Sequence, residues 1–109
     1  MTATWDEFER IEITVGRVLE VGELEGTRKA FRTLVIDFGE RGVRRSAAQI
    51  THYPPEGLIG RQVVAVLGFE PRPIGRFQSE VLVLGAISPE KGVVLLRPDD
   101  DVEDGSPVA

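Results

Sequence analysis

Two arginines and a phenylalanine are the residues of this chain best suited to ligand chemistry. Arg72, Arg76 and Phe77 lie within residues 71–77, a segment that also holds two prolines and a glycine. We expect a stiff irregular loop here, because no regular element tolerates this spacing of prolines and glycine. Planar guanidinium groups beside an aromatic ring suit phosphates and unstacked bases. A phenylalanine beside a strand is equally often a core residue, so both interpretations of Phe77 stay open.

The sequence contains few residues that could act as catalytic groups. His52 is the only histidine, cysteine is absent, and no nucleophile-elbow sequence accompanies the serines. The position of His52 in a connection beside Tyr53 predicts a surface or capping role rather than a general base. The carboxylates of residues 99–104 fail the calcium-loop spacing, because Asp104 stands where that loop needs glycine. We therefore predict no enzyme activity, no metal site and no cofactor.

The charge of the chain is unevenly distributed, although the net charge is −5. Residues 1–27 carry two basic and seven acidic groups, residues 28–97 carry eleven and six, and residues 98–109 carry five acidic groups and no basic group. An acidic chain argues against nucleic-acid binding, which is driven by neutralising phosphates. The basic middle segment nevertheless allows a local patch with weak, salt-sensitive affinity.

The N-terminal residues predict a short amphipathic helix. Thr4 and Glu7 match the capping box, so a helix is expected from Trp5 to about Arg10. Trp5 and Phe8 lie three residues apart on one face, which is too little apolar surface for an independent helix. We expect this face to pack on the same domain or on a second copy.

Short apolar segments predict a single, mainly β domain over residues 1–109. The first strand is expected to bulge or bend where Gly16 interrupts its alternation, and the run from Glu80 to Ile87 is expected to be a core strand covered on both faces. This pattern describes a five-stranded OB-fold barrel with a short N-terminal helix and a C-terminal extension that is loosely held. The strands are expected at residues 11–21, 31–39, 43–50, 62–69 and 80–87, with a closing strand at 93–98 and one helical turn at most within 52–60.

An OB-fold barrel binds oligonucleotides over its second and third strands, between the loops that join strands one to two and four to five. Eight of the eleven cations of residues 28–97 fall on these predicted elements. The alternative is an ordinary solvated sheet surface with interspersed charge. The residues predicted on this surface are Arg28, Lys29, Phe31, Arg32, Arg41, Arg44, Arg45, Ser46, Gln49, Arg72, Arg76 and Phe77.

Five sequence motifs follow one another in the order IEITVGRVLEV, LVIDFGE, RRSAAQIT, PEGLIGRQVVAVLGF and RFQSEVLVLGA. This order resembles the stand-alone tRNA-binding domain family, and within it the CsaA-like group, over nearly the whole chain. The resemblance implies an OB fold and a homodimer whose interface uses the N-terminal helix, with Trp5 and Phe8, together with C-terminal segments. It also implies a binding face lined by Ser46, Gln49, Ser79 and Glu80.

The resemblance further implies that the homodimer binds tRNA or similarly folded RNA without catalysis. The CsaA-like group is also described as export-related chaperones, so binding of apolar peptides from unfolded or exported polypeptides is the alternative. Glu80 and Gly68 depart from the pattern of relatives, and both departures argue against tight tRNA affinity and leave the peptide-binding alternative open. A dimeric scaffold that binds neither ligand is a third alternative. No targeting sequence or membrane-length apolar stretch occurs, so we expect a cytoplasmic protein without a membrane partner.

Overall fold

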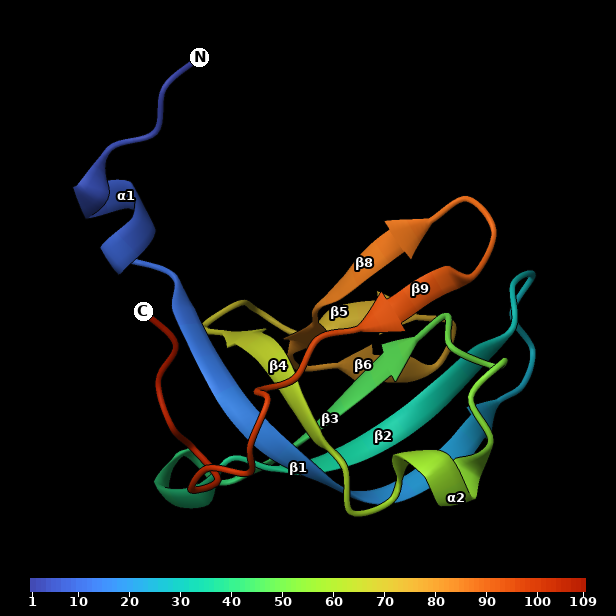
Figure 1. Cartoon of the computed structure of the whole chain (residues 1–109). Coiled ribbons are helices and arrows are strands. Elements are labelled where there is room, and N and C mark those ends of the chain that lie inside the picture. The colour runs from blue at the N-terminus through green and yellow to red at the C-terminus, as the bar shows by residue number, and fades with distance from the viewer.

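One long bent strand organises the computed structural model, which describes all of residues 1–109. Strand β1 (Glu12–Leu24) pairs antiparallel with β4 (Gln62–Leu67) through its first half and with β2 (Phe31–Asp37) through its second half. The pairing with β2 shifts register between Val18 and Glu20, and this bulge lets one strand serve two sides of a curled sheet (Figure 1).

The predicted bulge of the first strand is confirmed, but it lies three residues beyond Gly16. Gly16 is buried inside the sheet, and a Cβ atom there would lie 2.6 Å from side-chain atoms of both Ile36 and Phe38. The glycine therefore allows close packing of the core on β1. The interrupted alternation predicted the irregularity, and the close packing explains why its position was missed.

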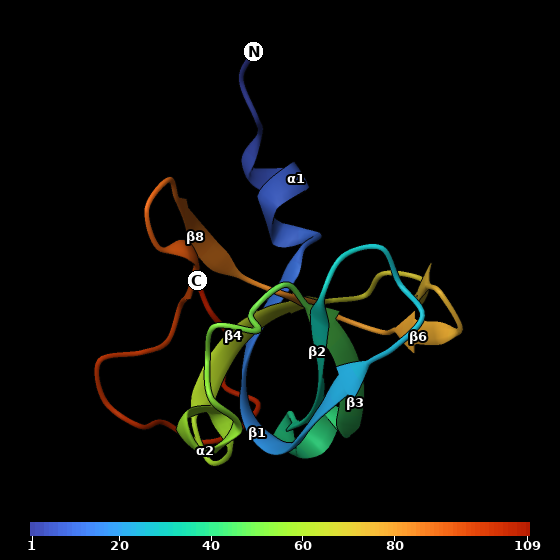
Figure 2. The same cartoon turned by 90° about the vertical axis from the view of Figure 1, so that its right-hand side faces the viewer.

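The five-stranded antiparallel sheet has the order β3-β2-β1-β4-β7 and curls into a barrel, which Figure 2 views end on. The predicted fold class, a mainly β OB-fold barrel, is confirmed. Fully buried aliphatic and aromatic residues fill the interior, with Phe38, Leu34 and Ile36 among the largest. The remaining barrel elements are β3 (Val43–Ala48), β7 (Leu82–Val83), the 3₁₀ helix η1 (Gly39–Arg41) and the short helix α2 (Pro55–Leu58).

The run from Glu80 to Ile87 is not one core strand. It divides into β7, which pairs with β4, and β8 (Gly85–Ser88), which leaves the barrel to pair with β9 (Gly92–Leu95). A Cβ atom at Gly85 would lie 2.6 Å from Val93, so glycine permits the close approach of β9 at the point of departure. Ile87 is 86% exposed on the resulting hairpin. The apolar composition was read correctly as strand, but the covering of both faces was wrong.

The proline-containing segment forms a β-hairpin instead of an irregular loop. Strand β5 (Arg72–Ile74) pairs with β6 (Phe77–Ser79), and Gly75, with φ of +61°, opens the two-residue turn between them. Proline is tolerated because the hairpin is an isolated two-stranded ribbon, in which an outer edge needs no ladder hydrogen bond. The segment is largely exposed, as predicted, but it is regular rather than irregular.

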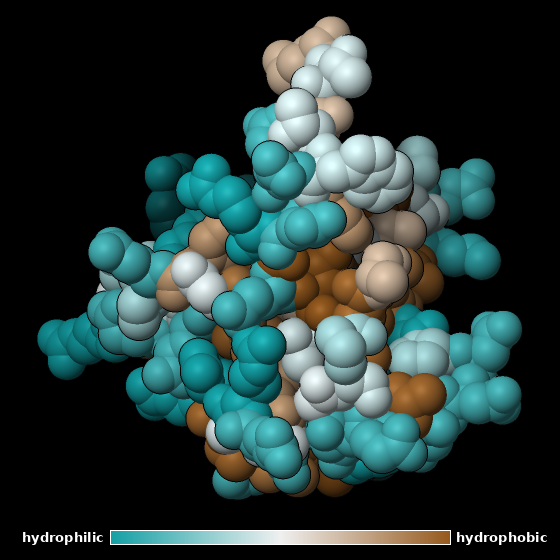
Figure 3. All heavy atoms as spheres, turned by 90° about the vertical axis from the view of Figure 1, so that its left-hand side faces the viewer, coloured by the Kyte–Doolittle hydropathy of each residue, from teal (hydrophilic) through white to brown (hydrophobic).

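Helix α1 (Trp5–Glu9) is confirmed together with both hydrogen bonds of its capping box between Thr4 and Glu7. The helix extends from the barrel on the N-terminal side of β1 (Figure 1). Trp5 is 80% exposed, and the rings of Trp5 and Phe8 meet edge to face at 6.5 Å. Below the helix, Figure 3 shows an apolar patch that continues onto the barrel. The apolar face of α1 therefore has no partner within its own chain.

The C-terminal extension is held against β1, contrary to the expectation that it would be loose. The amide of Val15 donates to the Ser106 carbonyl at 2.8 Å, and the amide of Val108 donates to the Ile13 carbonyl at 2.8 Å. An isolated bridge pairs Thr14 with Pro107. The extension acts as a short additional strand on the free edge of β1. Its acidic composition gave no indication of this pairing.

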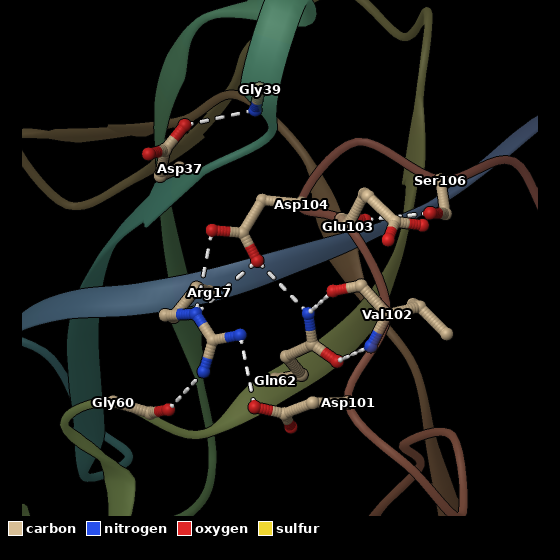
Figure 4. A network of polar contacts seen from close by, with 10 residues as sticks. All are labelled: Arg17, Asp37, Gly39, Gly60, Gln62, Asp101, Val102, Glu103, Asp104 and Ser106. Atoms are coloured by element: carbon tan, nitrogen blue, oxygen red, sulfur yellow. Dashed lines mark hydrogen bonds and ion pairs between the residues drawn. The ribbon is translucent and has the colours of Figure 1, made fainter.

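Arg17 of β1 and Gln62 of β4 bind the extension through their side chains, as Figure 4 shows. Arg17 forms ion pairs with Asp101 at 3.1 Å and with Asp104 at 3.2 Å. The buried amide of Gln62 donates to the Val102 carbonyl at 2.6 Å and accepts from the Val102 amide at 3.1 Å. Partial burial opposes the charged form of Arg17, but the hydrogen bond to Asp101 and both carboxylates outweigh it and raise the pKa of Arg17.

Candidate nucleic-acid interface

Two of the predicted contact residues close the barrel. Ser46 and Ser79 are only 1% and 8% exposed, with their hydroxyl oxygens 3.3 Å apart. The Ser46 hydroxyl donates to the Val81 carbonyl at 2.8 Å, and the Ala47 amide donates to the Ser79 hydroxyl at 3.2 Å. These bonds join the edge of β3 to the segment that precedes β7. Burial therefore gives both serines a structural role and removes Ser46 from the predicted contact surface.

Glu80 belongs to the same closure but keeps part of its carboxylate accessible. Its backbone amide donates to the Arg45 carbonyl at 2.8 Å, and its Oε1 atom accepts from the Arg45 amide at 2.8 Å. The residue is half-buried, and its side chain forms no ion pair. Two hydrogen bonds to one residue of β3 fix the position of this carboxylate beside the predicted binding face.

Arg32 lies inside the barrel rather than on its surface. It is 9% exposed, and its guanidinium donates to the carbonyls of Tyr53 and Thr51 at 2.9 and 3.3 Å. It also forms an ion pair with Glu23 at 3.2 Å. Arg32 shares the inward face of β2 with Leu34, because side chains of a strand alternate between faces. The predicted contact role of Arg32 is therefore corrected to a structural one.

Arg44 and Arg45 point to opposite faces of β3. Arg44 pairs with the core residue Ile36, and its Nε atom donates to the Arg41 carbonyl at the end of the hairpin. Arg41 is itself bound to the carboxylate of Glu12. Arg45 is exposed on the outer face. Strand periodicity therefore splits a pair that the sequence analysis treated as one surface.

Arg45 lies over the aromatic ring of Phe77, with its guanidinium carbon 5.2 Å from the ring centroid. This cation–π contact joins β3 to the β5–β6 hairpin. Phe77 pairs across the hairpin with Ile74, and Ser79 pairs with Arg72, so all four side chains share the hairpin face that looks toward the barrel. Phe77 is half-buried, so it is neither a full core residue nor a fully exposed ring.

A basic basin lies between the hairpin turn and the loop that connects β1 to β2. It has a volume of about 670 Å³ and is lined by Arg28, Lys29, Phe31 and Gly75, among others. Both cations are exposed, and Phe31 is half-buried at the start of β2. Gln49 is exposed just beyond β3 and forms no side-chain hydrogen bond in the structure. The two loops predicted to flank the binding face therefore meet around one concave surface.

A second, more apolar cavity lies on the other side of Arg72 and was missed by the sequence analysis. Its volume is about 340 Å³. Phe69 is 58% exposed at its edge and Leu82 is 48% exposed. Exposed apolar residues on both sides of the hairpin were the only available signal, and they were assigned to strands. The apolar lining consists of Ala47, Phe69, Ile74, Val81 and Leu82, and the polar lining of Glu70, Arg72, Ser79 and Glu80.

Five cations around the hairpin have no carboxylate partner, because every ion pair of the structure involves Arg17, Arg32 or Arg41. These five cations lie on the β1–β2 loop, the outer face of β3 and the hairpin, three elements already linked by the basin and by the Arg45–Phe77 contact. We call this surface the basic face. It comprises Arg28, Lys29, Arg45, Arg72 and Arg76, with Phe31 and Phe77 between them.

His52 has a structural contact, as its position in the sequence predicted. Its Nε2 atom lies 2.9 Å from the Val93 carbonyl, and the neighbouring Tyr53 hydroxyl accepts from the Leu95 amide at 3.0 Å. The two residues thereby hold the connection before β4 against β9. No group of three or more potential metal ligands occurs, and no helix has the length and apolarity needed to span a membrane.

Comparison with known proteins agrees with this architecture. The chain matches the family described as "Putative tRNA binding domain" over residues 13–107. The crystal structure of the chaperone CsaA from Bacillus anthracis has a TM-score of 0.94 and 40% identity, with 100% of both chains covered. The CsaA chaperone protein from Picrophilus torridus has a TM-score of 0.94 and 42% identity, with 99% of this chain and 100% of that chain covered.

The methionine–tRNA ligase of Methanothrix thermoacetophila is 39% identical over 93% of this chain, but the match spans only 15% of that enzyme. The likeness to ligases is therefore a likeness to one part of a much longer protein. The family match and the two CsaA structures, in contrast, cover all or nearly all of the present chain. The chain belongs to the tRNA-binding domain family and lies close to the CsaA proteins.

Proposed function

We propose that this protein binds tRNA or similarly folded RNA through the basic face, as a non-catalytic single-domain homodimer in the cytoplasm. The observation that carries the proposal is the group of five cations without carboxylate partners on linked elements of one OB-fold barrel. Guanidinium groups recognise phosphates by paired hydrogen bonds, and the rings of Phe31 and Phe77 offer stacking surfaces between them. Binding by a basic face on an acidic chain is expected to be weak and strongly salt-dependent.

A homodimer strengthens such binding, and the apolar surfaces of the chain support one. The exposed face of α1 carries Trp5 and Phe8, and a groove of about 630 Å³ lies between β4 and the C-terminal extension. The groove is lined by Ile13, Val64, Leu84 and Leu96, among others, on the side of the barrel that Figure 3 displays. We propose that the groove of one copy receives α1 of the other. Two basic faces on one rigid body then attach to a folded RNA at two points.

Charge-reversal variants test the RNA proposal. We expect Arg72→Glu and Arg76→Glu to weaken tRNA binding at least tenfold at low salt, and to lower the slope of log affinity against log salt by about 1 per lost phosphate contact. Lys91→Glu is the matched control, since it makes the same charge change on the β8–β9 hairpin, across the barrel from β6 (Figure 2). Equal effects of all three variants would contradict a localised basic face.

Sedimentation analysis tests the dimer. We expect Leu96→Asp and Trp5→Ser to shift the protein to a monomer, because each removes one side of the proposed contact. Leu19→Asp is the matched control, since Leu19 and Leu96 are 43% and 44% exposed and Leu19 does not line the groove. A dimer that survives in both Leu96→Asp and Trp5→Ser, or a native monomer, would contradict the proposed interface.

A peptide-binding chaperone is the alternative function, favoured by the likeness to CsaA chaperones and by the exposed apolar cavity beside Arg72. The two functions respond oppositely to salt. RNA binding should fall steeply as salt is added, whereas capture of an apolar peptide of an unfolded polypeptide should persist or strengthen. Binding of both ligands over a salt series therefore ranks the two functions directly.

A further inference from the structure

The 340 Å³ cavity beside Arg72 combines features that a phosphate-binding surface does not need. Its walls are largely apolar, and it contains two carboxylates, Glu70 and Glu80. A volume near the lower end of small-ligand pockets, which span about 300–1,000 Å³, suits one planar ring rather than a folded segment. The cavity therefore requires an occupant that is apolar on its faces and polar on its edge.

The charges around the cavity narrow the choice of occupant. Arg72 contributes a guanidinium without a carboxylate partner to the wall, and Arg45 and Arg76 lie on the same face nearby. A phosphate group is attracted to these cations but repelled by the two carboxylates that line the cavity. A nucleotide satisfies both conditions when its base enters the cavity and its phosphates remain on the arginines. An apolar peptide side chain can pack against the apolar walls of the cavity, but it leaves the arginines without a partner.

Glu80 is the group best placed to read the edge of such a base. Its Oε1 atom is held by the Arg45 amide at 2.8 Å, while the structure gives the other carboxylate oxygen no hydrogen-bond partner. A fixed carboxylate accepts hydrogen bonds only, so it favours base edges that donate. Guanine carries N1–H and N2–H donors side by side on its Watson–Crick edge, whereas uracil offers one N–H between two carbonyls. Single-stranded RNA is commonly recognised through this edge.

We propose that the cavity binds one unpaired nucleobase of the RNA, with a preference for guanine set by the carboxylate of Glu80. This inference rests on the proposed RNA-binding function and adds a requirement to it. The RNA must present an unstacked nucleotide next to a folded element whose phosphates reach Arg45, Arg72 and Arg76. The carboxylate that fits poorly beside a phosphate thereby becomes a specificity determinant.

A set of RNA hairpins tests the proposal. Each hairpin has the same stem and either a blunt end or one unpaired 3′ nucleotide, which is G, A, C or U. We expect unpaired guanine to bind about tenfold more tightly than unpaired uracil, because one good base-edge contact discriminates by about that factor. Glu80→Gln keeps an oxygen for the Arg45 amide but replaces the second oxygen by a donor, so it should abolish or reverse this preference. Binding of the blunt hairpin should change by less than about twofold.

Two further variants serve as controls. Glu70→Gln alters an exposed carboxylate of the same cavity that has no anchoring hydrogen bond, and it should retain the preference for guanine. Ala47→Leu fills the cavity from β3 and should remove the gain from any unpaired nucleotide while the blunt hairpin still binds. Circular dichroism of each variant checks that the barrel is intact.

The outcomes separate the cavity from the basic face. Equal affinity for blunt, G-, A-, C- and U-ended hairpins overturns the base site and leaves the RNA-binding proposal in place. Loss of unfolded-polypeptide binding in Ala47→Leu without any change in RNA binding overturns it in favour of a peptide site. Absence of binding to every hairpin and to tRNA at low salt overturns both proposals together.

Discussion

Arginines on two sides of this barrel have opposite surroundings. On one side, Arg17 is bound by Asp101 and Asp104 and is only 29% exposed in its side chain. On the other, the guanidinium of Arg45 stacks on Phe77 and forms no ion pair, and Arg76 is exposed at a hairpin turn. The first arrangement satisfies the guanidinium within the chain. The second leaves it available to a partner.

This contrast explains how an acidic chain can carry a nucleic-acid interface. Five of the eighteen acidic residues are in the C-terminal extension, where two carboxylates form ion pairs with Arg17 and the backbone is paired with β1. The extension therefore contributes to the barrel, and its charge is separated from the basic face by the fold. Net charge describes solubility and long-range steering, whereas the local pairing of each cation decides what it can bind.

The largest expected effect on stability comes from Gln62→Leu. The buried amide of Gln62 bonds to both backbone groups of Val102 and to Asp104. Leucine leaves the amide and the carbonyl of Val102 without partners, while Asp104 keeps only its ion pair with Arg17, so we expect a loss of roughly 3 kcal/mol in the free energy of unfolding. Urea denaturation measures it, and RNA affinity of the folded fraction should be unchanged. A loss below about 1 kcal/mol would mean that the extension contributes little to the barrel.

A matched pair of arginine variants tests the contrast directly. Arg17→Met removes two ion pairs with Asp101 and Asp104 and should cost about 1–2 kcal/mol of unfolding free energy, a modest value because the site is partly solvated. Arg76→Met should change stability by less than about 0.5 kcal/mol. For tRNA affinity we expect the reverse: Arg76→Met should weaken binding more than Arg17→Met does. Thermal unfolding and a binding titration on both proteins provide the comparison, and parallel changes in both quantities would remove the distinction.

The neighbouring residues Arg44 and Arg45 allow the same comparison within one strand, because they lie on opposite faces of β3. Arg45→Met should weaken tRNA binding about threefold to tenfold and lower the salt slope by about 1, since the outer face of β3 is part of the basic face. Arg44→Met should leave the slope unchanged, because its side chain lies on the inner face at the barrel rim beside Arg41. A salt titration of both variants measures this difference. Equal slopes would indicate contacts spread beyond the proposed face.

Parts of this arrangement were predictable from the sequence, because strand periodicity is local. Alternation of Leu34 and Ile36 predicted β2, and the same alternation places Arg32 on the inner face, two residues before Leu34. This periodicity was present in the sequence, but Arg32 was assigned to the surface because other cations of the chain were expected there. The split between Arg44 and Arg45 follows from the same period of two.

Other parts depended on contacts between distant residues, which no local pattern encodes. Asp101 lies 84 positions from its partner Arg17. Ser46 and Ser79 are 33 positions apart in the sequence and meet to close the barrel. Their structural role therefore could not be predicted from either segment alone. The apolar cavity is assembled from β3, the β5–β6 hairpin and the segment around β7, and appears only when these elements meet.

The smallest predicted effect concerns a carboxylate that is satisfied within its own helix. The Thr4 amide and hydroxyl donate to Glu7, and these hydrogen bonds lower the pKa of Glu7 from its usual value of 4.5. The contribution of this cap to helix stability is therefore fully present above pH 4.5 and is lost as the pH falls through the lowered pKa.

We expect the NMR signals of α1 to report local fraying in that acidic range while those of the barrel core stay unchanged. Glu7→Gln should remove this pH dependence, and Glu9→Gln, an exposed neighbour that makes no cap hydrogen bond, should retain it. If α1 docks into a second copy as proposed, acid should also loosen the dimer before the barrel unfolds, because the helix that frays carries Trp5 and Phe8. Dissociation that follows the barrel transition instead would place the dimer contact elsewhere.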